Sequence, residues 1–366
     1  MYSVKIDCYL IRAVGIFITL LYCVQLFVIW TNQTILNSEI TQFLYFLPLI
    51  ILFSFILLIL ISMKTSESFY CIIYLILGLY LGYILYLFQI SLIIRLILVF
   101  YVFPQYINLL LLYLLPLIIC IYGIINALVT RIKKITLKYP GFKGKITILH
   151  LSDIHLGAIH QKGSVSKIVK EIQELSEKPD VIVITGDMAD GSLKVKSSWL
   201  SPFDSFEQPI LFITGNHEQL NPKEDMLNAV KMTNIKHIGK HGSFRYKGVN
   251  FLGEDYEYDL KECLSRADID NNIPNVFLYH VPEISPEELA EYNIFLFLAG
   301  HTHGGQIFPL NIAAYFSNKC FAGLYSDESK MHHVFVSEGV NNAVVPMRVG
   351  SSRIFALITI EGEIEQ

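Results

Sequence analysis

The chain has 366 residues, enough for two domains, and its net charge of −4 excludes the strongly basic character that nucleic-acid binding usually requires. No nucleic-acid partner is therefore expected. The six cysteines form no CxxC pair or disulfide framework, which fits a reducing compartment without demanding one. The average composition hides two unlike parts: residues 1–130 hold only four basic and three acidic residues, and all eleven histidines come later.

Residues 1–130 are predicted to be a transmembrane domain of about four helices, because four stretches reach the roughly 20 apolar residues that cross a bilayer. These stretches are Tyr9–Trp30, Gln42–Met63, Tyr70–Ile90 and Ile107–Val129. Arg12 lies near the start of the first stretch, where its long side chain can reach the membrane interface. This stretch is too long for a cleavable signal peptide, and no small-residue cleavage site follows it.

The segment Ser91–Pro104 is apolar but too short to span a membrane, and it contains Arg95. We interpret it as an interfacial or re-entrant helix. The alternative is a fifth span, which would move the rest of the chain to the other side of the membrane.

Four spans place both ends of the chain on one side of the membrane. The first loop, residues 31–41, holds no lysine or arginine, whereas basic residues precede the first span and follow the last one. Those after the last span are Arg131, Lys133, Lys134 and Lys138. Because cytoplasmic loops are enriched in such residues, we expect a multi-pass protein of the cell membrane with its polar domain in the cytoplasm. The spans hold few ionisable residues, which favours an anchor over a transporter.

Residues 131–144 are interpreted as a basic juxtamembrane linker and residues 145–366 as the polar domain. In that domain, five short apolar runs of the kind that forms buried strands are each followed by polar residues. The runs are Ile146–Leu151, Val181–Thr185, Ile210–Thr214, Val276–Tyr279 and Ile294–Leu298. Between the first two, Ser164–Glu177 has apolar positions at helical spacing. The pattern predicts an α/β domain, in which ligands gather beyond the carboxyl ends of the strands.

The polar clusters after the five runs contain the residue types that hold metal ions. A single Asp-x-His or Gly-Asp pair indicates little, but five clusters in order, each after a predicted strand, indicate a metal site. Phosphoester hydrolysis builds charge on two oxygens, and two metals about 3.5–4 Å apart can stabilise both. Metals that close need an anionic bridge, and Asp187 supplies one beside the small Gly186.

The order of these motifs resembles the calcineurin-like metallophosphoesterases. The motifs are Asp153-x-His155, Gly186-Asp187-x-x-Asp190, Gly215-Asn216-His217-Glu218, His280 and Gly300-His301-Thr302-His303. The run Gly300–Ile307, preceded by an apolar domain, most resembles the bacterial membrane-anchored branch of that family. The resemblance covers about Lys145–Ile360 and implies a central β-sandwich flanked by helices.

The resemblance also implies a role for each motif residue. Asp153, His155 and His303 would hold one metal. Asn216, His280 and His301 would hold the other, and Asp187 would bridge the two. A hydroxide held by the metals would attack, His217 would protonate the leaving oxygen, and Asp190 would orient His217 by accepting its ring proton. Mn²⁺ is the first choice of metal, with Fe or Zn²⁺ as alternatives.

Membrane tethering favours a lipid-linked phosphoester or pyrophosphate as substrate. Soluble nucleotides or phosphoproteins are alternatives, although Gly191 and Ser192 stand where protein phosphatases of this family show Arg-Gly. A different class of function is a membrane transporter or sensor whose polar domain only binds a phosphorylated ligand. The sequence contains no feature that indicates an oligomeric state.

Three further expectations concern single residues outside the motifs. His150 is expected to lie in the core or to support the ligands from behind, and Arg348 is expected either to contact a substrate phosphate or to be an exposed structural residue. The late apolar residues could line a lipid-facing approach to the site, but we interpret them as core. They are Phe308, Tyr315, Phe316, Phe321 and Tyr325.

Overall fold

The computed structural model describes residues 8–36, 46–220 and 223–362. The chain divides into two compact units, Met1–Gly123 and Ile124–Gln366. The first unit is helical, and the second combines strands and helices.

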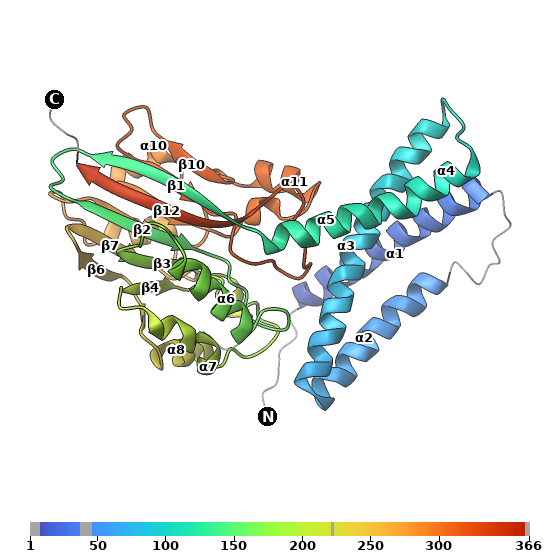
Figure 1. Cartoon of the computed structure of the whole chain (residues 1–366), viewed down its shortest axis with the longest axis horizontal. Helices are drawn as coiled ribbons and strands as arrows, with labels where there is room; N and C mark the ends of the chain where they lie inside the picture. The colour runs from blue at the N-terminus through green and yellow to red at the C-terminus, as the bar shows by residue number, and fades with distance from the viewer. Residues whose placement is uncertain (1–7, 37–45, 221–222, 363–366) are drawn as a thin grey trace. The chain divides into compact units, whose positions relative to one another are not determined.

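Apolar helices make up the first unit (Figure 1). They are α1 (Cys8–Leu36), α2 (Leu47–Thr65), α3 (Glu67–Leu98), α4 (Gln105–Leu109), a π-helical turn η2 (Leu110–Leu114) and α5 (Leu115–Leu128), whose last turn belongs to the second unit. Ser66 caps α3, because its hydroxyl accepts a hydrogen bond from the Phe69 N–H at 3.1 Å. Within the described residues, three helical stretches are long and apolar enough to cross a membrane: Gly15–Ile35, Glu67–Leu98 and Gln105–Leu128. The apolar part of α2, Leu47–Ser62, is shorter.

The expectation of a separate helix at Ser91–Pro104 is wrong. Residues 91–98 continue α3, and no independent fifth span occurs in the part of the chain that the structure describes. Arg95 does not interrupt the helix, because its guanidinium donates to the Trp30 carbonyl and to the Thr34 hydroxyl, both at 2.7 Å. Because the charged Arg95 has hydrogen-bond partners near the end of α1, the apolar helix α3 can continue past it.

Two six-stranded mixed sheets form the centre of the second unit. The first has the order β1 (Thr130–Tyr139), β12 (Arg353–Gly362), β2 (Lys145–Leu151), β3 (Val181–Thr185), β4 (Ile210–Ile213) and β5 (Ile235–His237). The second has the order β10 (Gly323–Ser326), β11 (His333–Val336), β9 (Leu296–Ala299), β8 (Asn275–Leu278), β7 (Val249–Gly253) and β6 (Gly242–Tyr246). β2, β3 and β4 are parallel to one another, as are β7, β8 and β9.

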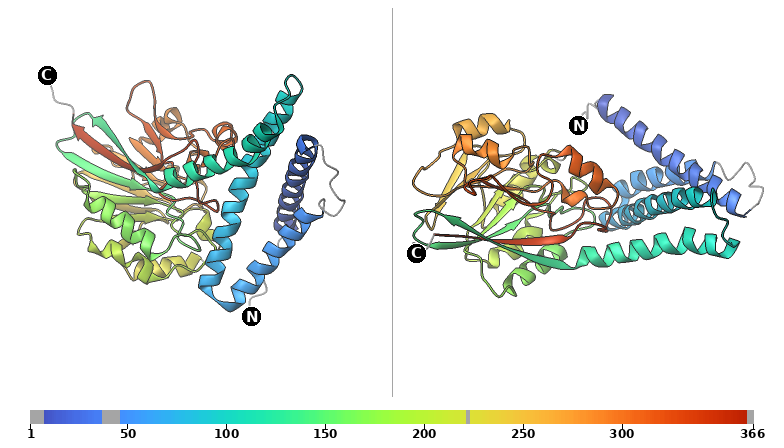
Figure 2. Two further views of the ribbon diagram at one scale, coloured as in Figure 1. Left: turned by 45° about the vertical axis from the view of Figure 1, so that its right-hand side comes forward. Right: turned by 90° about the horizontal axis from the view of Figure 1, so that it is seen from above.

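Helices cover both outer faces of the sandwich (Figure 2). A core that includes Ile148, Leu211 and Phe251 fills the space between the sheets. The first sheet packs on α6 (Lys162–Gln173), α7 (Ser197–Leu200) and α8 (Lys223–Lys231), and the second on α9 (Leu260–Arg266) and α10 (Pro286–Leu289). The predicted fold class, apolar helices followed by an α/β domain with a central β-sandwich, is confirmed.

All five predicted strands and the predicted helix are present, within a few residues of the expected limits. The segment 131–144, expected as a linker, instead contains most of β1, which pairs in parallel with β12. The reason is its alternation: Leu137 is buried while the flanking Thr136 and Lys138 are exposed, as on an edge strand with one face toward the core.

The interpretation of the late apolar residues as core is wrong for three of them. Phe308, Tyr315 and Phe316 are 45%, 57% and 80% exposed. The last two lie on α11 (Leu310–Ser317), a helix with no buried residue.

Candidate metal centre

The loops that follow β2, β3, β4, β8 and β9 meet at one edge of the sandwich. The His155 N–H donates to the Asp187 carbonyl at 2.9 Å, which joins the loops after β2 and β3. The His301 N–H lies 3.2 Å from both oxygens of Asp153, which joins the two sheets. Because parallel strands end at the same edge, all seven predicted ligands are brought together.

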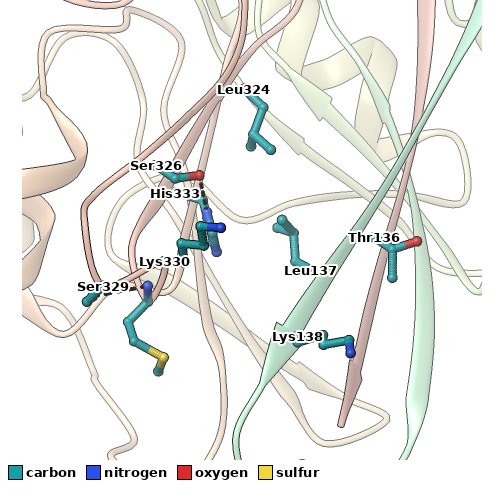
Figure 3. Close-up of a pocket in the computed structure, with 9 residues that line it drawn as sticks. Thr136, Leu137, Lys138, Leu324, Ser326, Ser329, Lys330 and His333 are labelled. Atoms are coloured by element: carbon teal, nitrogen blue, oxygen red, sulfur yellow. Dashed lines mark hydrogen bonds between the residues drawn. The ribbon is translucent and has the colours of Figure 1, made fainter. Parts of the chain in front are cut away.

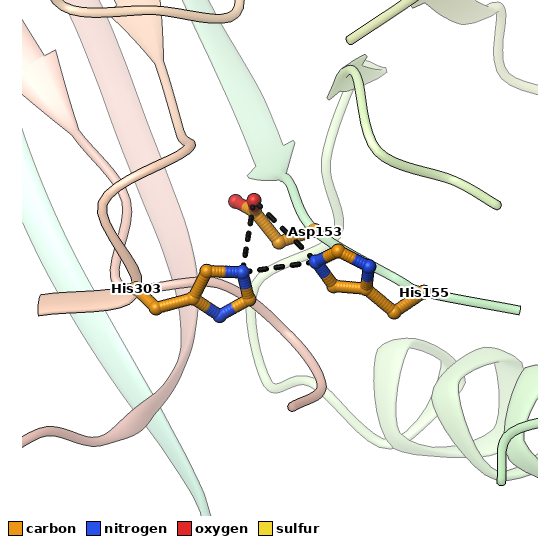
Figure 4. Close-up of side chains that lie close together, drawn as sticks. All are labelled: Asp153, His155 and His303. Atoms are coloured by element: carbon orange, nitrogen blue, oxygen red, sulfur yellow. Dashed lines mark hydrogen bonds and ion pairs between the residues drawn. The ribbon is translucent and has the colours of Figure 1, made fainter. Parts of the chain in front are cut away.

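One group of donors consists of Asp153, His155 and His303 (Figure 4). The two imidazoles present their Nε2 atoms to each other at 2.9 Å. Asp153 Oδ1 lies 3.3 Å from the Nε2 of His303 and 3.9 Å from that of His155. Three side chains from two loops therefore aim ligand atoms at one point.

A second group consists of Asp187, Asn216, His280 and His301. Asn216 Oδ1 lies 3.0 Å from His280 Nε2 and 2.9 Å from His301 Nδ1. Asp187 Oδ2 lies 3.2 Å from His280 Nε2 and 3.8 Å from His155 Nε2. Asp187 thus stands between the two groups, as a bridging carboxylate would.

The backbone at these positions is strained. Asp153, His155, Asp187, His301 and His303 have positive φ angles of 48–70°, a region that non-glycine residues rarely occupy. Each such residue costs on the order of 1–3 kcal/mol and persists only where the surroundings enforce it. Five of seven candidate ligands share this feature, which marks the edge as a functional site.

Two glycines allow the close approach of the loops after β3 and β4. A Cβ on Gly186 would lie 2.7 Å from both the Gly215 nitrogen and His280 Nδ1. A Cβ on Gly215 would lie 2.3 Å from Asp187 Oδ1. Any larger residue at either position would therefore displace Asp187 or His280.

The electrostatics of the edge suit bound cations. Three carboxylates, Asp153, Asp187 and Glu218, are at most 2% exposed. Burial raises the pKa of Asp153 to about 6, and burial together with nearby Asp187 raises that of Glu218 to about 7. So many buried carboxylates call for positive charge among them.

The imidazoles supply little of that charge. Burial lowers the pKa of His155 to about 3 and that of His301 to about 4, so both rings are neutral near pH 7 and offer lone pairs. His280 is the exception: burial alone would lower its pKa, but the Asp187 carboxylate raises it to about 9. Neutral imidazoles, carboxylates and an amide oxygen form a donor set that fits divalent transition metals.

His217 is partly open to solvent, with 24% of its side chain exposed. Its Nε2 lies 3.9 Å from Asp187 Oδ2, and its Nδ1 lies 3.0 Å from the backbone carbonyl of Asp190. The expected partner was the Asp190 carboxylate, but Oδ1 of that carboxylate accepts hydrogen bonds from the N–H and hydroxyl of Ser192 instead. The carbonyl can accept the ring proton equally well, so Asp190 orients His217 through its main chain.

Glu218 was assigned no role from the sequence, although it directly follows His217 in the motif. It is 1% exposed and accepts hydrogen bonds from the N–H groups of Asp187, Ala189 and Gly215 at 3.0, 2.8 and 2.6 Å. One carboxylate thereby fixes the loops after β3 and β4 to each other. The signal in the sequence was an acidic residue beside ligand-type residues at a strand end.

Replacing Glu218 by glutamine should loosen this junction. The new amide NH₂ group must face at least one N–H donor, and a buried unsatisfied polar group costs about 1–3 kcal/mol. We expect a lower unfolding temperature for Glu218→Gln and metal affinity reduced by about 10- to 100-fold, as is typical of groups that support ligands. The exposed Glu224→Gln on α8 is the control, measured by thermal unfolding and metal titration. Equal behaviour of the two variants would contradict the role given to Glu218.

Two of the single-residue expectations are settled by burial. His150 is fully buried in β2, and its Nε2 lies 2.7 Å from the Thr185 hydroxyl, so the core interpretation is confirmed. Arg348 is 0% exposed, and its guanidinium donates to the carbonyls of His303 and Asn341 at 3.2 and 2.7 Å. The expectation of an exposed structural arginine is therefore wrong in its exposure, because Arg348 is buried and its guanidinium bonds to protein carbonyls.

Two other features lie apart from this edge. A surface pocket of about 600 Å³ opens between β1 and the β10–β11 hairpin, lined in part by Leu137, Leu324 and His333 (Figure 3). It contains none of the candidate ligands. His241, Glu254 and Cys263 form a further group of metal-ligand types, in which His241 is paired with Glu254.

Known proteins resemble the chain over the region that carries these motifs. Residues 146–305 match the family model of the calcineurin-like phosphoesterases. A transmembrane protein with a metallophosphoesterase domain from Bos taurus is 31% identical over 64% of this chain and 58% of its own length. A metallophosphoesterase of Helicobacter pylori (strain J99) is 26% identical over 60% of each chain. The chain therefore spans less than two thirds of the length of these relatives. The solved purple acid phosphatase PPD1 from yellow lupin aligns over 59% of this chain and 46% of its own, with 18% identity and a TM-score of 0.35, a likeness too low to support an argument.

Proposed function

We propose that the chain, whose residues 146–305 match the family model of the calcineurin-like phosphoesterases, is a membrane-anchored phosphoesterase that uses two divalent metal ions. The observation that carries the proposal is the position of Asp187. Its Oδ2 lies 3.2 Å from His280 Nε2, in one donor group, and 3.8 Å from His155 Nε2, in the other. A carboxylate shared by two such groups is the feature that a dinuclear centre requires.

Each donor group would hold one metal ion. Asp153, His155 and His303 form the first site. Asn216, His280 and His301 form the second, and Asp187 serves both. When bound, two divalent ions lower the pKa of a coordinated water and neutralise charge that develops on the phosphoester oxygens. The mixed nitrogen and oxygen donors suit Mn²⁺ first, with Fe or Zn²⁺ as alternatives.

The residues of the chain position these donors and move one proton. The His280 ring is oriented by its Nδ1, which lies 2.8 Å from the Thr185 carbonyl, so Nε2 faces Asn216 and Asp187. The His217 ring is oriented in the same way by the Asp190 carbonyl. Nε2 of His217 then lies 3.9 Å from Asp187 Oδ2, beside both donor groups, where it would donate a proton to the oxygen of the departing group.

The test of this proposal is hydrolysis by the purified full-length chain. With Mn²⁺ it should cleave a generic aryl phosphodiester, and a chelator should stop the reaction reversibly. Absence of turnover on aryl phosphodiesters, phosphomonoesters and pyrophosphates with Mn²⁺, Fe²⁺ or Zn²⁺ would refute it. The alternative function, a transporter or sensor that only binds a phosphorylated ligand, then predicts ligand affinity that is unchanged in Asp187→Asn.

The variant His217→Ala should lower kcat by about 10²- to 10⁴-fold, the range typical of a general acid, while its metal content stays at the wild-type level. Substrates with better leaving groups should lose less, because they need less protonation. Asp190→Asn should lose far less activity than His217→Ala, because the carbonyl that orients His217 is retained. A larger loss in Asp190→Asn would show that the carboxylate takes part.

For the substrate, we propose a lipid-linked phosphoester or pyrophosphate, cleaved on the cytoplasmic side. The supporting observations are the apolar helices that precede the domain and the basic residues that follow the last of them. A screen of membrane lipids treated with wild type and with His217→Ala would identify a phospholipid that only the wild type consumes. Consumption of soluble nucleotides alone would contradict the lipid assignment.

A further inference from the structure

The helix α11 directly follows the last metal-site motif and has an unusual surface for a protein in water. Its eight residues, Leu310–Ser317, include no charged residue, and none of them is buried. Leu310, Ile312, Tyr315 and Phe316 are 51%, 49%, 57% and 80% exposed. Exposed apolar side chains on one uncharged helix mark a contact with another apolar phase or with a partner.

Both ends of α11 are fastened to the turn that carries His303. At its start, a Cβ on Gly305 would lie 2.1 Å from the Asn311 Cα, so the helix packs directly on the motif. After its end, the Phe321 carbonyl accepts a hydrogen bond from the Thr302 hydroxyl at 2.7 Å. A displacement of α11 would therefore move Thr302 and Gly305, which lie on either side of His303.

The same part of the second unit also holds the end of the last apolar helix. Asn126, in the final turn of α5, donates through Nδ2 to the carbonyls of Arg348 and Ser351 at 3.1 and 2.9 Å. In that same loop, the Val349 carbonyl accepts a hydrogen bond from the Phe308 N–H at 2.8 Å, just before α11 begins. One short loop thus connects the base of α11 with the end of a helix that is long enough to cross a membrane.

This connection decides between the possible occupants of the α11 surface. Where the stretch Gln105–Leu128 leaves the bilayer, Leu128 and Val129 remain 61% and 51% exposed, as lipid-facing residues do. A loop bonded to that helix end would lie at the membrane surface, and the Phe308 N–H bonds to this loop just before α11 begins. Aromatic and aliphatic side chains on an uncharged helix face are the residue types that insert into the headgroup boundary.

We propose that α11 lies in the membrane interface and holds the mouth of the candidate metal centre at the level of the lipid headgroups. The substrate phosphate would then be part of a lipid that stays in its bilayer during the reaction. This second statement rests on the proposed function, whereas the contact of α11 with the membrane does not.

The contact can be tested in the full chain reconstituted into phosphatidylcholine vesicles. Phe316→Trp places a reporter on α11, and Met232→Trp, at a position that is 74% exposed beyond α8, is the matched control. Fluorescence is read as the increment over wild type, because the chain already holds two tryptophans. Brominated lipids should quench the increment of Phe316→Trp at least severalfold more than that of Met232→Trp, and aqueous iodide should show the reverse.

Two outcomes would overturn the proposal. If α11 faces water, iodide quenches the fluorescence increment of Phe316→Trp as strongly as that of Met232→Trp. The increment of Phe316→Trp is protected from both quenchers if a second copy or another protein covers α11. Neither measurement needs turnover, so a failure here is separable from a failure of the proposed phosphoesterase activity.

The consequence for the substrate needs a second experiment. The pair Ile312→Ser and Phe316→Ser should reduce hydrolysis of vesicle-embedded phospholipid by at least tenfold and leave hydrolysis of a soluble aryl phosphodiester within about twofold. Met232→Ser should change neither rate. Equal loss on both substrates would show that α11 only supports the fold of the site, and unchanged rates on both would show that α11 does not serve a lipid substrate.

Discussion

Asp187→Asn is expected to abolish phosphoester hydrolysis and to reduce the metal content of the protein. Asparagine keeps the size of the side chain but removes the negative charge that two cations would share, and its amide can offer a lone pair on one side only. Groups that merely support metal ligands typically contribute 10- to 100-fold to affinity or activity, so loss of a shared ligand should exceed about 100-fold. The measurements are kcat/KM with Mn²⁺ and the number of ions bound per chain.

The matched control is Asp225→Asn, which removes a carboxylate of the same type from an ion pair at the surface of α8. It should leave activity and metal content unchanged. An Asp187→Asn protein that is folded and retains two tightly bound ions would contradict the bridging role. Retention of one ion with loss of the other would still be consistent with it, since each group has three further donors.

The second large effect concerns stability. Arg348→Met should lower the free energy of unfolding by about 3–5 kcal/mol, because it removes a buried charge from five acceptors and leaves two of them, the Asn341 carbonyl and the Asn342 side chain, without a donor. The five acceptors are the carbonyls of His303, Asn341 and Gly339, the Asn342 side chain and the Ser351 hydroxyl. Affinity of the first metal group should also fall, because the His303 carbonyl loses the guanidinium and keeps only the hydrogen bond from the Gln306 N–H.

Denaturant unfolding of the detergent-solubilised chain, with and without Mn²⁺, measures this effect. Arg266→Met is the control, since Arg266 makes an exposed ion pair with Glu262 on α9 and should contribute less than about 0.5 kcal/mol. A variant that stays as stable as wild type but loses activity would mean that the guanidinium serves the substrate instead.

Much of the site was predictable because its residues are placed by local patterns. A buried parallel strand has a continuous apolar run, and the polar residue after the run must lie at the sheet edge. Val181–Thr185 predicted β3 with the correct limits, and Asp187 therefore had to lie at that edge. The same reasoning placed Asp153 and His155 after β2 and the two histidines of Gly300–His303 after β9.

The direction of a side chain was not predictable in the same way. Asp190 was correctly placed near His217, but its carboxylate turns to Ser192 and leaves the contact to its carbonyl. Glu218 needed three N–H donors from two loops before its role was visible. Three of these contacts, His217 with Asp190 and Glu218 with Asp187 and Ala189, join residues about 30 positions apart, and no local spacing specifies them.

The sequence alone determined the two-part organisation, the class of each part and the identity of the candidate ligands, because composition and strand periodicity are local properties. Only the tertiary structure decided that residues 130–139 are an edge strand, that Arg348 is buried and that α11 is exposed. The physical reason is the same in each case. A segment of a given composition can lie either in solvent or against the rest of the protein. Segments distant in the chain decide which of the two occurs, and local composition does not specify them.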